Sequence, residues 1–230
     1  MKRAELLDYL AGRIVRLEQT HPVRVAIDGP DAAGKTTLAQ ELSEPLRARG
    51  RPVIRASIDG FHHPARVRHA RGPLSPEGYY RDSFDCRALV ESLLTPLGPG
   101  GSRRYRPAVF DYRTDTEVRT PYRVAEVNAV LLFDGVFLLR TELAGYWDFT
   151  VFVDASFETT LTRAERRDAA LFGGAEEVRR RYERRYIPGQ RLYFAECLPR
   201  GRADVVVNND DPRNPVISPN EGHGAGTPTQ

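Results

Sequence analysis

Short runs of mostly apolar residues recur along the chain, and longer segments with helical periodicity lie between them. Nearly continuous apolar runs are typical of parallel strands that are covered on both faces. We expect strands at 23–27, 52–58, 129–133, 149–153 and 204–207. Strands that alternate with helices predict an α/β fold, a doubly wound parallel sheet with helices on both faces.

The segments between these runs favour helices. Residues 2–19 place four leucines and Ile14 on one side of a helix, which we expect to pack outside the sheet. A second helix is expected to end near Arg49, because Gly50 suits the position after a helix. Further helices are expected at 84–97, 138–147 and 157–198.

Three segments fit neither pattern. Residues 61–83 are interrupted by glycine and proline and predict a long loop, which in a compact domain is usually functional or disordered. Residues 103–127 alternate in places and predict a β-hairpin. Residues 209–230 offer little to bury and predict a disordered tail, so one domain is expected over 1–208.

The segment 29–36 reads Gly-Pro-Asp-Ala-Ala-Gly-Lys-Thr and matches the phosphate-binding loop pattern G-x-x-x-x-G-K-[ST]. It follows a predicted strand and opens a predicted helix, which is the context that gives this pattern meaning. Its backbone N–H groups and the helix N-terminus favour an anion, and a fold of the P-loop NTPase type follows. The predicted nucleotide-binding residues are Gly29, Pro30, Asp31, Ala32, Ala33, Gly34, Lys35, Thr36 and Thr37.

Lysine usage supports this prediction. The chain has 34 Lys and Arg residues, but only Lys2 and Lys35 are lysines. Lysine is a compact point charge on a thin stem, whereas arginine is a bulky fork, so its use at Lys35 suits contact with phosphate.

Composition limits the alternatives. The chain has 230 residues, is 40% hydrophobic and 28% charged, and carries a net charge of +3, so charge alone does not imply nucleic acid. No apolar run approaches the ~18 residues of a membrane span, and the N-terminus lacks an apolar signal core. The two cysteines have no metal-like spacing. We expect a cytoplasmic protein without membrane or nucleic-acid partners; homo-oligomerisation is left open.

Two acidic residues directly follow predicted strands. Asp134 ends an apolar strand as a Walker B acid does, and Asp59 follows the second strand. Ligands of such sheets bind beyond the carboxyl ends of the strands, so both should meet the glycine loop. Thr36, Asp59 and Asp134 are the predicted Mg²⁺ residues, with Asp59 also a candidate base. The alternatives are a helix N-cap for Asp134 and a turn residue for Asp59.

The segment at about 157–185 is rich in arginine and contains Gly173-Gly174 as a natural hinge. A mobile helical pair that brings arginine over a triphosphate is a lid, and Arg163 and Arg167 are its candidate catalytic residues together with Lys35. For most arginines in this segment, a solvated face with i,i+4 ion pairs is the alternative.

Several aromatic residues lie in the two irregular regions and could stack on a planar substrate. The candidates are Phe61, Tyr79, Phe84, Phe110 and Tyr112. Ordinary packing is the alternative for each of them.

Several stretches, in order over about residues 20–208, resemble the uridine kinase family, which is grouped with phosphoribulokinase and bacterial pantothenate kinase. They are the P-loop with its preceding strand, Ser-Ile-Asp-Gly-Phe at 57–61, Phe-Asp at 84–85, Phe-Asp-Tyr at 110–112, Leu-Phe-Asp-Gly at 132–135, Arg-Ala-Glu-Arg-Arg-Asp at 163–168 and Tyr-Phe-Ala-Glu-Cys-Leu-Pro at 193–199.

The resemblance implies that Asp59 is the general base, that Thr36, Asp59 and Asp134 surround Mg²⁺, and that Arg163 and Arg167 are lid arginines. The family usually has Glu at the position of Asp134. It also has a base-contacting His after the aromatic pair, where this chain has Asp115, which is therefore a candidate substrate residue.

The expected function is ATP-dependent phosphoryl transfer to a small metabolite, with the 5′-hydroxyl of a pyrimidine nucleoside as the first candidate acceptor. Pantothenate, a sugar phosphate and nicotinamide riboside are the alternatives, as is a non-catalytic nucleotide-binding module. A GTPase is excluded, because its guanine-reading motif needs a lysine that this chain does not have.

Overall fold

The computed structural model describes residues 1–218, and within them a six-stranded sheet has the order β10-β9-β8-β1-β7-β2. Its neighbours pair in parallel, except that β10 is antiparallel to β9. The strands are β1 (Val23–Asp28), β2 (Val53–Ser57), β7 (Val130–Asp134), β8 (Phe149–Asp154), β9 (Val205–Asn208) and β10 (Val216–Ser218). Because β1 lies between β7 and β8, the loop that follows it opens at a topological switch point.

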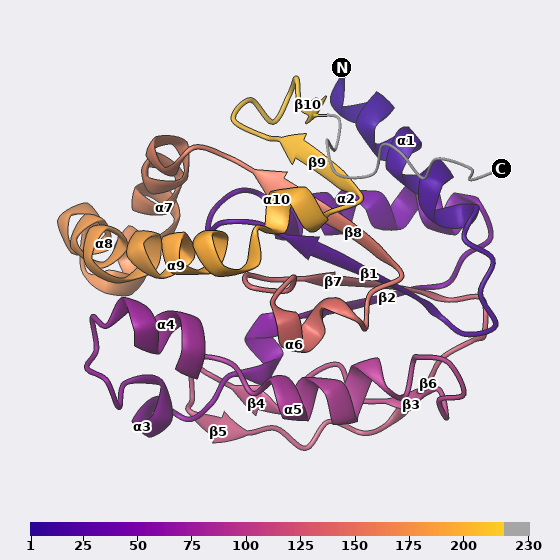
Figure 1. Ribbon diagram of the computed structural model, residues 1–230, viewed down its shortest axis with the longest axis horizontal. Coiled ribbons are helices and arrows are strands. Elements are labelled where there is room, and N and C mark those ends of the chain that lie inside the picture. The colour runs from indigo at the N-terminus through magenta and orange to yellow at the C-terminus, as the bar shows by residue number, and fades with distance from the viewer. Residues whose placement is uncertain (219–230) are drawn as a thin grey trace, which may run out of the picture.

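Successive side chains of the strands enter two different cores, as the period of two in a β-strand requires. Val25 and Ile27 pack with α1 (Arg3–Val15) and α2 (Lys35–Ala48), whereas Ala26 packs into the core on the opposite face. Figure 1 shows α1 and α2 on one side of the sheet and α5 and α6 on the other. The predicted fold class is confirmed.

The remaining elements surround this sheet. The other helices are α3 (Ala65–Arg68), α4 (Pro76–Asp82), α5 (Cys86–Leu89), α6 (Thr141–Ala144), α7 (Phe157–Phe172), α8 (Ala175–Arg181), α9 (Ile187–Cys197) and α10 (Pro199–Arg202). Short 3-10 or π turns are η1 (Ile58–Phe61), η2 (Val90–Leu94) and η3 (Tyr182–Tyr186). Two nested short hairpins pair β3 (Arg104–Tyr105) with β6 (Arg123–Val124) and β4 (Phe110–Asp111) with β5 (Thr116–Glu117).

The prediction of an unbroken loop over 61–83 is wrong, because α3 and α4 lie inside it. Pro76 occupies the first turn of α4, where the missing N–H costs nothing. The Ser75 hydroxyl accepts a hydrogen bond from the N–H of Gly78 at 3.0 Å and caps the helix. The proline and glycine that suggested an interruption therefore belong to a helix start.

The prediction of a disordered tail from residue 209 is wrong for residues 209–218. Val216–Ser218 forms the strand β10, which pairs with β9. Asn209 is buried, and its backbone N–H donates to the carbonyl of Asp154 at 2.7 Å. The rest of the predicted tail, 219–230, lies outside the described residues.

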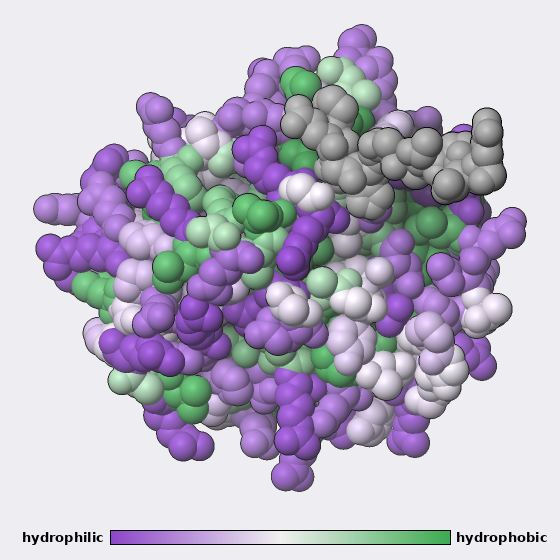
Figure 2. Space-filling view, in the orientation of Figure 1, coloured by the Kyte–Doolittle hydropathy of each residue, from purple (hydrophilic) through white to green (hydrophobic). Residues whose placement is uncertain are grey.

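The face shown in Figure 2 is largely hydrophilic, with small separate hydrophobic patches. Among residues 1–218, no helix is both long and apolar enough to span a membrane.

Candidate active site

The loop after β1 is shaped by two glycines with positive φ. Gly29 has φ +146°, and a Cβ there would lie 2.1 Å from the carbonyl oxygen of Val153 in β8. Gly34 has φ +99°, and its Cβ would lie 2.6 Å from the side-chain nitrogen of Asn209. Both positions therefore exclude side chains, which is how a glycine loop brings its backbone close to its surroundings.

Lys35 is the first residue of α2, and its side chain is buried. The Nζ donates to the carbonyl oxygen of Pro30 at 2.6 Å and so folds back over the loop. Burial lowers the pKa of Lys35, while the nearby carboxylates of Asp31, Asp28 and others oppose that shift. The amine of Lys35 thus lies inside the predicted phosphate-binding loop.

The loop is also held by helices far away in sequence. The backbone N–H of Asp31 donates to Gln190 Oε1 of α9 at 3.0 Å, and the Tyr79 hydroxyl of α4 donates to Asp31 Oδ2 at 2.5 Å. Tyr79 is buried, and its hydroxyl is used by the loop. The structure therefore places this candidate substrate residue where it supports the P-loop.

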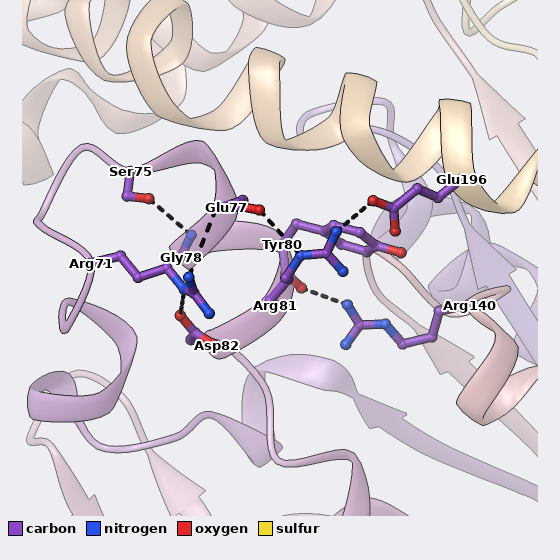
Figure 3. Close-up of polar contacts among 9 residues, drawn as sticks. All are labelled: Arg71, Ser75, Glu77, Gly78, Tyr80, Arg81, Asp82, Arg140 and Glu196. Carbon is purple, nitrogen blue, oxygen red and sulfur yellow. Dashed lines mark hydrogen bonds and ion pairs between the residues drawn. The ribbon is translucent and has the colours of Figure 1, made fainter.

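Helix α4 is itself held by polar contacts on two sides (Figure 3). Arg81 pairs with Glu196 of α9 at 2.5 Å, and Arg140 donates to the backbone carbonyl of Tyr80 at 2.5 Å. These contacts fix the helix that carries Tyr79, and with it one wall of the loop.

The hydroxyl of Thr36 donates to Oδ2 of Asp134 at 2.6 Å, so two predicted metal residues are in contact. Their hard oxygens suit Mg²⁺, which usually takes only one or two protein carboxylates and completes its shell with water and substrate phosphate. Among the described residues, no group of three or more His, Cys, Asp or Glu could hold a metal by itself. The oxygens of Thr36 and Asp134 therefore fit a metal ion that is also bound by the phosphates of a nucleotide.

Asp59 lies in the turn η1 directly after β2, and its backbone N–H donates to the capping hydroxyl of Ser57 at 3.3 Å. The side chain keeps an exposed face, although protein surrounds most of it. Loss of solvation raises the pKa of Asp59 to about 6, and the charges of Asp31 and Asp134 act in the same direction. Lys35 and Arg167 oppose this shift. A carboxyl with such a pKa is suited to proton transfer near neutrality.

A cavity of about 800 Å³ lies over the P-loop, and both candidate lid arginines line it. Arg163 donates to the backbone carbonyls of Asn209 and Asp210 at 2.8 and 2.9 Å. Arg167 forms two bonds with the neighbouring carboxylate of Asp168, at 2.7 and 2.8 Å. The described lining is Arg3, Ala32, Gly34, Lys35, Thr36, Thr37, Glu41, Arg163, Arg167, Asn209, Pro212 and Arg213.

Several of these lining residues were not predicted from the sequence. Asn209 clamps the loop, because its side-chain N–H donates to the carbonyl of Ala33 at 2.7 Å while Arg3 donates to its Oδ1 at 3.3 Å. Asn209 directly follows β9 in the structure, but in the sequence it is the first residue of the predicted tail. Arg3 lies in a helix with no motif, so no signal marked it.

The candidate aromatic residues separate into two groups. Phe61 is fully buried and contacts Phe133, and Phe84 is buried against Phe137, so these rings pack in the core behind the site. This placement argues against direct ligand contact by Phe61.

Phe110 and Tyr112 lie beside His62. The Tyr112 ring is centred 4.8 Å from that of His62, whose Nδ1 lies 3.1 Å from the backbone oxygen of Asp59. Burial lowers the pKa of His62 to about 4, so the ring is neutral at pH 7. Phe110 and His62 line a second cavity of about 500 Å³, whose other lining residues are Pro64, Asp85, Ala88, Arg106, Val109, Glu117, Val118 and Arg119.

Asp115 has positive φ (+55°) at the tip of the β4–β5 hairpin. Its Oδ1 accepts from the backbone N–H of Ala65 at 2.8 Å and from Arg68 at 2.9 Å. These bonds hold the pKa of Asp115 below its usual value. The carboxylate thus joins the two irregular segments, which is a role that the sequence did not suggest.

The lid candidate spans α7 and α8, and the two glycines between these helices have positive φ, +86° for Gly173 and +129° for Gly174. Arg179 of α8 pairs with Glu165 of α7 at 2.6 Å. Arg180 and Arg181 both pair with Glu177, as the alternative assignment expected. Arg185 is instead buried and donates to the carbonyl of Pro73 at 2.8 Å.

Comparison with known proteins relates this geometry to a family. A family model described as phosphoribulokinase/uridine kinase matches residues 24–209. A search of curated proteins gives no match.

Solved structures share the fold. A possible uridine kinase from Bacillus stearothermophilus superposes with a TM-score of 0.67 at 24% identity, over 88% of this chain and 97% of that one. A candidate fructose transport system kinase from Silicibacter sp. TM1040 gives 0.72 at 23% identity, over 90% and 98%. D-glycerate 3-kinase from Cryptococcus neoformans gives 0.60 at 13% identity, over 93% and 98%.

Proposed function

The chain belongs to the phosphoribulokinase/uridine kinase family, and from this premise we propose that it transfers the γ-phosphoryl group of ATP to a hydroxyl of a small metabolite. One observation carries the proposal: the phosphate loop, an acid with a pKa of about 6 and two lid arginines meet at the carboxyl ends of the central strands. Phosphoryl transfer needs positioning and charge stabilisation, and these groups supply both.

ATP is proposed to bind with its phosphates on the backbone N–H groups of the loop at 29–37 and with Lys35 beside them. Arg163 and Arg167 line the same cavity and are the proposed cations for the transferred group. Thr36 and Asp134, with Asp59 nearby, would hold Mg²⁺, which supplies charge neutralisation on the phosphates when it is bound.

Asp59 is the proposed general base. It accepts the proton of the acceptor hydroxyl as that oxygen forms a bond to the γ-phosphorus, and the bond from the γ-phosphorus to the β,γ-bridging oxygen breaks to release ADP. The raised pKa makes Asp59 a stronger base than an ordinary carboxylate, and at pH 7 most of it is still ionised.

The first candidate acceptor is the 5′-hydroxyl of a pyrimidine nucleoside. Tyr112 and Phe110 stand on the hairpin that packs against η1, where the N–H of Val109 donates to the carbonyl of Gly60 at 2.9 Å. This contact joins the hairpin to the turn that carries the proposed base. The relative described as a possible uridine kinase supports the same choice.

An acceptor with an anionic group is the second candidate, favoured by the cavity beside His62. Arg106 and Arg119 line it, and Arg106 Nε is buried without a hydrogen-bond partner among the described residues. The fold shared with D-glycerate 3-kinase, whose name gives an acid as its acceptor, is consistent with this choice.

ADP production by the purified protein with Mg²⁺ and ATP tests the proposal. The acceptor panel would contain uridine, cytidine, other nucleosides, nicotinamide riboside, pantothenate, glycerate and ribulose 5-phosphate. Turnover on uridine or cytidine is expected, turnover only on acids or phosphates would select the second candidate, and bound ATP without turnover on any acceptor would contradict the kinase proposal. A cytoplasmic location remains a prediction, and homo-oligomerisation stays open.

A further inference from the structure

The carboxylate of Asp134 has a partner that the sequence did not indicate. Arg55 of β2 places Nη2 3.1 Å from Asp134 Oδ1 and 3.5 Å from the backbone oxygen of Thr36. β2 and β7 pair in parallel, and this register brings the end of β2 beside Asp134. The Asp134 side chain is only 4% exposed and that of Arg55 is 28% exposed, so the carboxylate end of the ion pair is the buried one.

Both oxygens of Asp134 are therefore used by the protein. Oδ2 accepts from the Thr36 hydroxyl at 2.6 Å, and Oδ1 accepts from Arg55. A divalent cation that binds either oxygen directly must displace one of these donors. It must also approach the guanidinium charge, which is only partly screened because the pair is part-buried.

A second observation shows that Arg55 is not fully satisfied by the ion pair. Its Nε is buried and has no hydrogen-bond partner among the described residues. A buried donor without a partner costs free energy, which a purely structural arginine would normally avoid. Arg55 thus keeps an unpaired buried donor beside the two metal residues Thr36 and Asp134.

We propose that Arg55 is a positioning residue that competes with the divalent cation for Asp134 and so sets the metal concentration at which the site fills. This inference rests on one part of the proposed function, which is that the site binds a nucleotide together with a divalent metal ion. With Arg55 in place, Asp134 stays oriented toward Thr36 and the metal binds more weakly. Without it, the carboxylate is free to take the metal more tightly.

The test is a titration with Mn²⁺ in the presence of ADP, with free Mn²⁺ measured by electron paramagnetic resonance and no acceptor present. Arg55→Met removes the charge at similar length, and the half-saturating Mn²⁺ concentration is expected to fall about tenfold, as loss of a nearby, partly shielded cation implies. Arg55→Lys keeps a charge but loses the planar fork, so a smaller fall is expected.

Arg51→Met is the matched control. Arg51 lies just before β2, and its Nε donates to the carbonyl of Asn128, at the opposite end of the strand from Asp134. This variant is expected to leave the Mn²⁺ titration unchanged. In an Asp134→Asn background, Arg55→Met is also expected to have no effect, because the group for which arginine and metal compete has gone.

Unchanged or weaker Mn²⁺ binding in folded Arg55→Met would overturn the proposal, since a purely structural ion pair would change the melting temperature alone. If Arg55→Met does not fold, Arg55→Lys is used instead, and unchanged or weaker Mn²⁺ binding in that variant would overturn the proposal. If no acceptor is phosphorylated in the kinase assay, the proposed function is contradicted. The Mn²⁺ titration still tests the role of Arg55, because it contains no acceptor.

Discussion

The two sides of the candidate site are built in different ways. On the nucleotide side, the loop after β1 is enclosed by the sheet, α9 and the segment after β9, and its contacts involve backbone atoms and buried side chains. On the acceptor side, 61–83 and 103–127 form short helices and two-residue strands that are joined by exposed ion pairs such as that of Asp115 with Arg68.

This difference follows from what each side must recognise. A triphosphate is bound by backbone N–H groups and a cation, so one backbone shape serves any nucleotide-using relative. An acceptor is recognised by side chains on loops, which can change without disturbing the sheet. The proposed nucleotide side therefore rests on backbone geometry, whereas the proposed acceptor side rests on individual side chains.

The largest expected effect comes from Asp59, which stands between the two sides. Asp59→Asn removes the proposed base and should lower kcat about 10³-fold, while ATP and acceptor binding change little. Single-turnover kinetics with calorimetric binding of both ligands measure this. Wild-type kcat in Asp59→Asn would contradict the assignment of the base.

The raised pKa of Asp59 gives that variant a further signature. In the folded protein the ionised carboxylate is disfavoured, so the wild type loses stability as pH rises from 3.8 to about 6. Asp59→Asn should therefore melt at a higher temperature than wild type at pH 8, with no difference at pH 3.5. The kcat/KM of the wild type should fall as pH drops below about 6.

Lys35 is expected to have the next largest effect, on the nucleotide side alone. Lys35→Met should lower kcat/KM for ATP about 10²-fold, because a preorganised cation beside the phosphates is lost. Lys2→Met, the only other lysine substitution that the chain offers, is the control and should behave as wild type. Steady-state kinetics with ATP varied measure both. If Lys35→Met weakened acceptor binding as much as ATP binding, the two sides of the site would not be independent.

Asn209 tests whether the segment after β9 is part of the nucleotide side. Asn209→Ala removes the hydrogen bond to Ala33 and should weaken ATP binding about tenfold, since a buried carbonyl loses its partner. Asn128→Ala is the control, because the side chain of Asn128 donates to the carbonyl of Gly50 before β7 begins, at the opposite end of the sheet from the loop. Fluorescence titration with a labelled ATP analogue distinguishes them, and equal affinities in the two variants would contradict the clamp.

The smallest effect is expected on the acceptor side. Asp115→Asn weakens an exposed pair with Arg68, so the KM of the acceptor should rise a few-fold with no change for ATP. Steady-state kinetics with each substrate varied check this. A change in the KM for ATP would show that the hairpin reaches the nucleotide.

The family resemblance and the fold class inferred from sequence are both confirmed, and the reason lies in how strongly each signal is constrained. The apolar strands mark themselves by burial on both faces, and a glycine loop after a strand has few other uses. Asp59 and Asp134 were placed at strand ends by the same logic, and both lie there in the structure.

The parts that could not be predicted depend on contacts between distant segments. Asn209 looks like the first residue of a polar tail, until Arg163 and Ala33 supply its partners. Pro76 looks like an interruption, until the Ser75 cap is seen. Arg55 is one arginine among many in the sequence, and only the register of β2 with β7 brings it to Asp134.

The central place of β1 also has a consequence for how the chain folds. Its neighbours are β7 and β8, so Val25 must find Leu132 and Phe149, both more than a hundred residues later in the chain. Pairings of such high contact order form slowly. We therefore expect the phosphate loop to gain its shape late, after β8 has docked. ATP is then expected to stabilise the folded domain by slowing unfolding without accelerating folding.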